Sequence, residues 1–195
     1  IVEKGFMGID AFSLKNLEVF QSLSNQEGHG TLIKSIDETI TAGGGRLLSK
    51  NVIKPLTNKQ EITNRLDTVE KFVNNPNMLH SIRDALYKSF DLQRILGKVN
   101  KLKASPRELL SIGTTLDLIP KIKKILESMN DENIEKISES FCETNFIVEK
   151  IFSMLDDNPS INLSKGDVIK KGVDPELDEL RDLRLNGKRW ISNYQ

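Results

Sequence analysis

The sequence is short of net charge, cysteine and long apolar runs. Its 28 Lys and Arg residues balance 28 Asp and Glu residues, so the whole-chain field favours neither nucleic acid nor an anionic membrane. A single cysteine, Cys142, excludes a disulfide framework within the chain and favours a reducing compartment. No run approaches the roughly 18 apolar residues of a membrane span, so we expect no membrane partner.

Motifs for catalysis and cofactor binding are also missing. The run Gly43-Gly44-Gly45-Arg46 lacks the Lys-Ser/Thr pair that completes a phosphate loop, and we expect a weak or distorted helix start there. His29 and His80 stand without the several converging ligands that a metal site needs. Cys142 has no neighbouring cation in the sequence that would activate its thiol. We therefore expect no catalytic, cofactor-binding or metal site here, and no enzyme activity of this chain alone.

Helix start signals are what the sequence does contain. Ser105-Pro106-Arg107-Glu108 is the clearest, because Ser caps, Pro fits the first helical position and Glu can reach back to the cap. Asn58 and Glu61 repeat the arrangement, and Asp174-Pro175 begins a last helix. After Asn58, apolar residues recur on one helical face, at Ile62, Leu66, Val69 and Val73.

These patterns predict an all-α protein, an irregular helical bundle with a short N-terminal strand and a protruding C-terminal helix. We expect the strand, at Phe6-Met7-Gly8-Ile9, and a lead-in within 1–24, a helical core over 25–155, a linker with a short strand over 156–173, and the start of a long helix over 174–195. The sequence begins with Ile1, and its last stretch, 189–195, has helical character and no stop signal, which indicates a fragment.

The predicted last helix has an apolar stripe along one side. Its members are Leu180, Leu183, Trp190, Ile191 and Tyr194. The order of acids first and bases last complements the helix dipole and needs no partner. The stripe does need one, because an isolated helix of this length is not stable in water. We expect self-association through 180–194, against another copy or against the body of the chain.

Six charged residues lie at helix starts or on helix faces that also carry apolar residues. They are Arg46, Arg65, Asp67, Asp91, Arg94 and Arg107. Such charges commonly cap helices or form surface pairs worth about 0–1 kcal/mol. A structural role and an interdomain role both remain open for this set.

Several segments form one ordered series along the chain. They include Ser105-Pro106-Arg107-Glu108-Leu109 and Glu176-Leu177-Asp178-Glu179-Leu180-Arg181, with 7–20, 32–41, 44–48, 55–56, 62–70, 91–96 and 166–172. In this order, over nearly the whole chain, they resemble the core domain of MutS-type DNA mismatch-repair proteins. The sequence departs from that family at Ala42-Gly43, where the family tends to have a larger apolar residue.

The resemblance implies a core and lever that transmits conformational change between an ATPase domain and a DNA clamp, both outside this sequence. For the intact protein it implies an ATPase that uses ATP and Mg, mismatched double-stranded DNA as partner, a dimer, and a cytoplasmic, nucleoid-associated location. The last helix would then climb toward the clamp and place Arg181, Arg184, Lys188 and Arg189 on the DNA side.

Two other functions stay open. The chain could be a stand-alone helical interaction module that docks a partner through the Trp190 stripe. It could also be an enzyme with an unrecognised site, which a converging polar pocket with perturbed carboxylates would favour.

Overall fold

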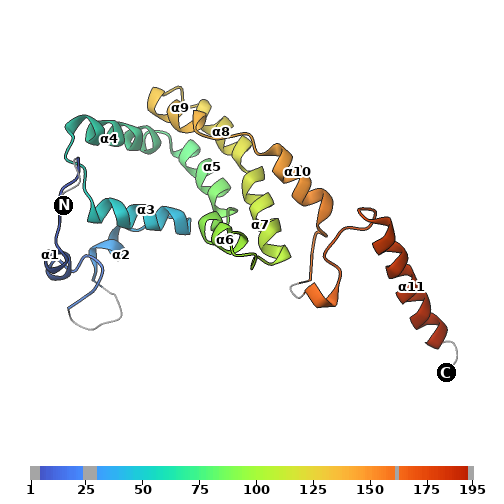
Figure 1. The fold of residues 1–195 in the computed structure, drawn as a ribbon. Coiled ribbons are helices and arrows are strands. Elements are labelled where there is room, and N and C mark those ends of the chain that lie inside the picture. The colour runs from blue at the N-terminus through green and yellow to red at the C-terminus, as the bar shows by residue number, and fades with distance from the viewer. Residues whose placement is uncertain (1–4, 24–29, 161–162, 193–195) are drawn as a thin grey trace. The chain divides into compact units, whose positions relative to one another are not determined.

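The structure, a computed structural model, describes residues 5–23, 30–160 and 163–192 of the 195-residue chain (Figure 1). Helices dominate these residues, which confirms the all-α prediction, and β-pairing within them is limited to two isolated bridges. The elements are α1 (Ala11–Asn16), α2 (Leu32–Ile36), α3 (Ala42–Ile53), α4 (Lys59–Val73), α5 (Pro76–Tyr87), α6 (Leu92–Val99), α7 (Pro106–Asp117), α8 (Ile119–Glu127), α9 (Glu132–Glu139), α10 (Asn145–Met154), the 3₁₀ turn η1 (Leu163–Lys165) and α11 (Pro175–Ser192).

The chain divides into two compact units. Unit 1 consists of Ile1–Gln93 with Leu118–Cys142, and unit 2 of Arg94–Asp117 with Glu143–Gln195. Each unit therefore combines segments that are distant in sequence. The four sequence segments expected above follow chain order and stay a prediction.

The N-terminal strand expected at 6–9 is not confirmed. Phe6 alone pairs, in an antiparallel bridge with Leu56. Beside it the Met7 N–H donates to the Pro55 carbonyl at 2.8 Å. Asp10 then caps α1 by accepting from the Ser13 N–H at 2.8 Å, so a helix begins where a strand would have to continue.

The glycine run does not distort the start of α3. Thr41 is an ordinary N-cap, and its hydroxyl accepts a hydrogen bond from the Gly44 N–H at 3.0 Å. The three glycines therefore lie in the first turn of a regular helix. The prediction of a distorted start is wrong, because the cap satisfies a backbone donor that would otherwise lack a partner, and the prediction of a weak start stays a prediction.

Unit 1 has its core where α5, α8 and α9 meet. Ala85 and Ile134 are fully buried there, together with Ile122 and Leu126. The apolar face expected on α4 exists, but Leu66 is 61% exposed and Val73 is 65% exposed. The periodicity thus identified the helix correctly and gave no information on what covers its face.

Unit 2 is built on the pairing of α7 with α10, which lie side by side (Figure 1). Gly113 lies at the contact, where an added Cβ would be 3.0 Å from both Ile151 Cγ2 and Phe152 Cε1. Ile112 beside it is 8% exposed. A residue without a side chain is therefore what lets the two helices approach so closely.

Candidate functional site at the base of the C-terminal helix

Helix α11 begins as its sequence predicts. The Asp174 carboxylate accepts hydrogen bonds from the Glu176 N–H at 3.0 Å and from the Leu177 N–H at 3.2 Å. Pro175 occupies the first helical position, where its missing N–H leaves no partner unsatisfied. The cap and the proline fix where the helix starts.

A second set of contacts holds α11 one turn above its start. Asp178 Oδ2 accepts from the Gly172 N–H at 2.6 Å, and Asp178 Oδ1 accepts from Arg181 Nη1 at 2.9 Å. Arg181 Nη2 donates to the Ile169 carbonyl at 2.7 Å. The side chains of Asp178 and Arg181 are only 17% and 22% exposed, respectively. We call these four residues, Ile169, Gly172, Asp178 and Arg181, the helix-base latch.

The latch favours the ionised form of its carboxylate. The hydrogen bond from the Gly172 N–H is the main cause that lowers the pKa of Asp178, and the Arg181 guanidinium adds to it. Asp178 therefore stays charged at neutral pH and remains an acceptor for both partners.

The segment that carries Ile169 is itself tied to the end of α10. Ile169 forms an antiparallel bridge with Leu155, flanked by hydrogen bonds from the Asp156 N–H to the Val168 carbonyl and from the Lys170 N–H to the Met154 carbonyl, both 2.9 Å. The Lys170 ammonium also donates to the Phe152 carbonyl at 2.9 Å. The short strand expected in this linker is thus a single bridge, and it fastens the latch to α10.

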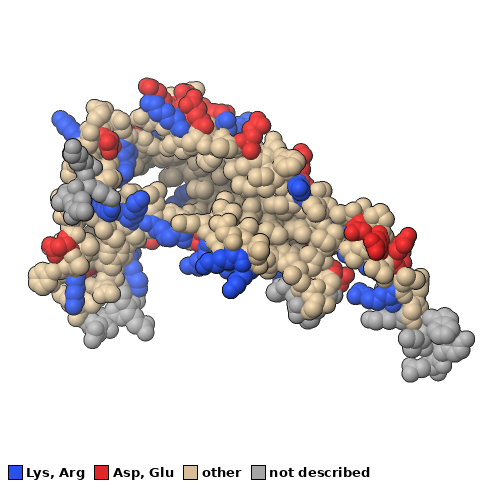
Figure 2. Space-filling view, viewed as in Figure 1, with Lys and Arg blue, Asp and Glu red and all other residues tan. Residues whose placement is uncertain are grey.

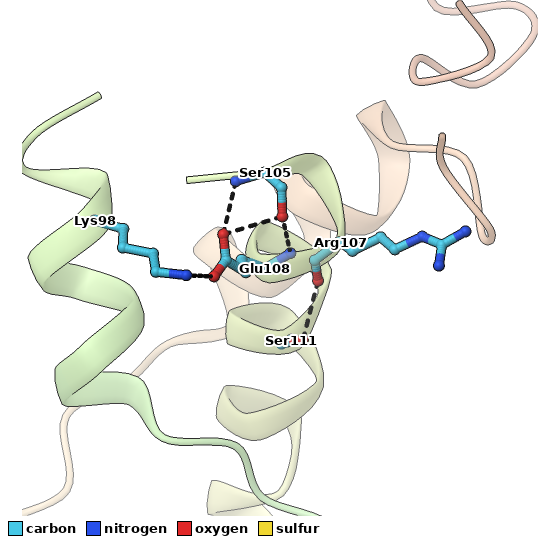
Figure 3. A network of polar contacts seen from close by, with 5 residues as sticks. All are labelled: Lys98, Ser105, Arg107, Glu108 and Ser111. Atoms are coloured by element: carbon cyan, nitrogen blue, oxygen red, sulfur yellow. Dashed lines mark hydrogen bonds and ion pairs between the residues drawn. The ribbon is translucent and has the colours of Figure 1, made fainter. Parts of the chain in front are cut away.

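A polar network surrounds the start of α7 (Figure 3). Ser105 and Glu108 form the expected capping box: the Ser105 N–H donates to Glu108 Oε2 at 2.9 Å, and the Glu108 N–H donates to Ser105 Oγ at 3.4 Å. Lys98 of α6 donates to Glu108 Oε1. The lysine and the serine together lower the pKa of Glu108 to about 2.

Arg107 points away from this network in Figure 3 and holds the segment that follows α10. Its Nε donates to the Pro159 carbonyl at 2.9 Å, and Nη2 lies 3.5 Å from Asn158 Oδ1. Pro159 is fully buried. Within unit 2, hydrogen bonds thus link α6 to α7. Both α7 and α10 are linked to the segment 155–172, and that segment is linked to α11.

The remaining charged residues of the predicted set lie elsewhere. Arg46 and Asp91 come together in a bidentate pair, with both N···O distances 2.8 Å. Arg65 and Asp67 are exposed on α4, while Arg94 lies on α6 and has an interaction partner. Of this set, the structure shows Arg46 and Asp91 joined as a pair.

The side chains predicted on α11 are described only in part. Leu180, Leu183 and Arg184 are exposed. The side chains of Lys188, Arg189, Trp190 and Ile191 and the whole of Tyr194 lie outside the described residues. Self-association through the stripe accordingly stays a prediction.

Sequence reasoning missed the latch. It placed Arg181 on the DNA side and Asp178 in the acidic start of the helix. Their spacing of three residues could have indicated the ion pair. Nothing in the residue types could have indicated the third partner, because the Ile169 acceptor is a backbone carbonyl.

Charge is mixed on the visible face, where Figure 2 shows acidic and basic side chains on the described part of α11. No helix in the described residues is both long and apolar enough to cross a bilayer. The same residues hold no group of three or more His, Cys, Asp or Glu side chains that could bind a metal. What the base of α11 can do chemically is fasten one element to another.

Comparison with known proteins gives a consistent result. The family model for MutS domain III matches residues 13–191. A "DNA mismatch repair protein MutS" of Clostridium perfringens is 34% identical over 190 residues, which are 97% of this chain and 21% of that protein. A protein of the same name from Caldanaerobacter subterraneus subsp. tengcongensis is 35% identical over 99% of this chain and 22% of that protein. Another, from Halothermothrix orenii, is 37% identical over 97% of this chain and 21% of that protein. The chain spans about a fifth of the length of these relatives.

Proposed function

This chain belongs to the MutS domain III family, and we propose on that basis that it is the core and lever segment of a DNA mismatch-repair protein. In this proposal a parent protein binds mismatched double-stranded DNA, works as a dimer and is cytoplasmic and nucleoid-associated. The chain itself carries conformational change between an ATPase domain and a DNA clamp.

One structural observation supports the mechanical part of the proposal. Hydrogen bonds in unit 2 join α6 to α7, α7 to the Pro159 carbonyl, and the segment around Ile169 both to α10 and to the base of α11. A segment that transmits motion needs such ties, because packed helices shift as rigid bodies between discrete arrangements. The signal would be a change in the direction of α11.

The described residues around the glycine run do not fit ATP or Mg. The glycines at 43–45 begin α3 under the Thr41 cap, and Asp37 rather than a lysine lies beside Gly45, 3.6 Å from the position of an added Cβ. An acid at that place would repel a phosphate. Both cofactors would be bound by other parts of the parent protein, and we derive no step of this mechanism from them.

Contact with DNA is a small part of the proposed role. The exposed Arg184, followed by Lys188 and Arg189, would lie toward the clamp end of α11. Contacts of this kind go to phosphates and position the duplex without selecting a sequence. Mismatch recognition would then belong to other parts of the parent.

Binding of the full-length parent to a mismatched and a matched duplex tests this function. Both duplexes are titrated with and without ATP at one fixed salt concentration, since phosphate contacts make affinity strongly salt-dependent. We expect tighter binding to the mismatch and loosening of that complex by ATP. Equal binding that ATP leaves unchanged would overturn the proposal and favour a protein-interaction module.

A further inference from the structure

Arg181 and Arg184 lie three residues apart on α11 but differ in their surroundings. Arg181 donates to a carboxylate of its own helix and to the Ile169 carbonyl outside it, and it is largely shielded from solvent. Arg184 is exposed. The two residues carry the same charge, so any difference between them reflects contacts rather than electrostatics at long range.

The start of α11 is a natural joint. Gly172 has a φ of +87°, a left-handed conformation that side chains disfavour, and residues 171–172 form a turn before the Asp174 cap. The cap holds only the first amides of the helix. A helix held at its first turn alone can swing about the residues that precede it.

We propose that Arg181 is the positioning residue that locks this joint and so sets the direction of α11 on unit 2. Its planar guanidinium has two donors in fixed geometry, one used on Asp178 and one on Ile169. Asp178 in turn holds the Gly172 N–H. The latch therefore ties α11 to the bridged segment at two points, and two ties restrict rotation where one does not.

This role rests on the proposed lever function, and within it Arg181 becomes a residue that holds the helix rather than one that contacts DNA. Nη1 of Arg181 donates to Asp178 Oδ1 at 2.9 Å, and Nη2 donates to the Ile169 carbonyl at 2.7 Å, so both nitrogens are engaged within the chain. A guanidinium held in this way does not present its charge to a DNA phosphate. Arg181 acts on DNA binding only through the direction of the helix.

Distance measurements between α7 and α11 test the latch in the full-length parent. Spin labels are attached at the exposed Thr114 and Asn186 through T114C and N186C, in a background where Cys142 and any other cysteines are replaced. We expect a narrow distance distribution for the otherwise unaltered protein and for R184A, the matched control. R181A should broaden it about twofold or more, because the tie to the Ile169 carbonyl is then lost and only the Gly172–Asp178 contact remains beside the cap.

A milder variant keeps the test decisive if R181A folds poorly. R181K preserves the charge but offers a single donor group that cannot serve both acceptors in the same geometry. We expect an intermediate width with unchanged helical circular dichroism. A distribution for R181K or R181A as narrow as that of R184A would overturn the latch, and so would a broad distribution in the unaltered protein.

The distance measurement needs neither ATP nor DNA, so its outcome is separate from that of the proposed function. In the same parent protein, R181A should slow ATP-triggered release from a mismatched duplex by at least about fivefold, a coupling of ordinary size. If the unaltered parent shows no ATP-triggered release, the lever function fails, and the distance distributions still decide whether Arg181 locks the helix.

Discussion

Helices α4 and α7 have similar start signals in the sequence, but their apolar sides lie in opposite environments. Each has a side-chain cap, Asn58 for α4 and Ser105 for α7, followed by apolar residues at helical spacing. In α7 the apolar side is buried against α10, and Ile112 is 8% exposed. In α4 most of that side faces solvent, with Leu66 at 61%.

The difference shows that capping and periodicity specify a helix, whereas burial depends on a partner. A stripe of apolar residues indicates only that one side of a helix is less favourable in water, and it does not identify the partner that covers it. The contact that buries it comes from residues far away in sequence, such as Ile151 and Phe152 for α7. Stability should therefore respond very differently to the same kind of change in the two helices.

Removing one large apolar side chain from each helix should give the largest contrast. I112A should lower the free energy of unfolding by about 2–5 kcal/mol, because it leaves a cavity at a buried position. L66A should lower it by less than about 1 kcal/mol, because that side chain is mostly in water already. Urea denaturation of the 195-residue chain measures both values, and equal losses would mean that the α4 face is covered after all.

Adding one methyl group at two glycines should sharpen the same contrast within unit 2. G113A should destabilise by about 1–3 kcal/mol, because the new Cβ is forced against Ile151 and Phe152. At Gly97 of α6 an added Cβ meets nothing within 4 Å, so G97A should stabilise by up to about 1 kcal/mol through helix propensity. Thermal unfolding of both variants decides this, and stabilisation by G113A would show that α7 and α10 are not closely packed.

The caps should differ in their response to acid. The pKa of Glu108 is lowered from 4.5 to about 2 by Lys98 and Ser105, so its contribution to stability is complete above about pH 4.5 and is lost as the pH falls toward 2. E108Q should remove that part of the acid dependence. E61Q on α4, where Asn58 accepts the cap hydrogen bonds, is the matched control substitution. Denaturation at several pH values measures the effect, and parallel profiles for E108Q and the unaltered chain would contradict it.

Local features could be predicted from the sequence because their partners are close along the chain. The Ser105–Glu108 box and the Asp174 cap each involve residues within three positions of one another. Arg46 and Asp91 are 45 residues apart, and no local rule pairs them. The strand expected at Phe6 failed because the Asp10 cap starts a helix within four residues. Arg181 was noticed as a cation, but its backbone acceptor at Ile169 has no signature in the sequence.

Release from mismatched DNA after a flexible insertion in the joint tests the central claim, mechanical transmission, most directly. Gly-Ser-Gly is inserted between Gly172 and Val173 of the full-length parent, which loosens the connection of Asp178 and Arg181 on α11 to Gly172 and Ile169 without altering any residue. The account predicts that the insertion keeps preferential binding to a mismatch without ATP and abolishes ATP-triggered release. Release at the unaltered rate would contradict transmission through the base of α11.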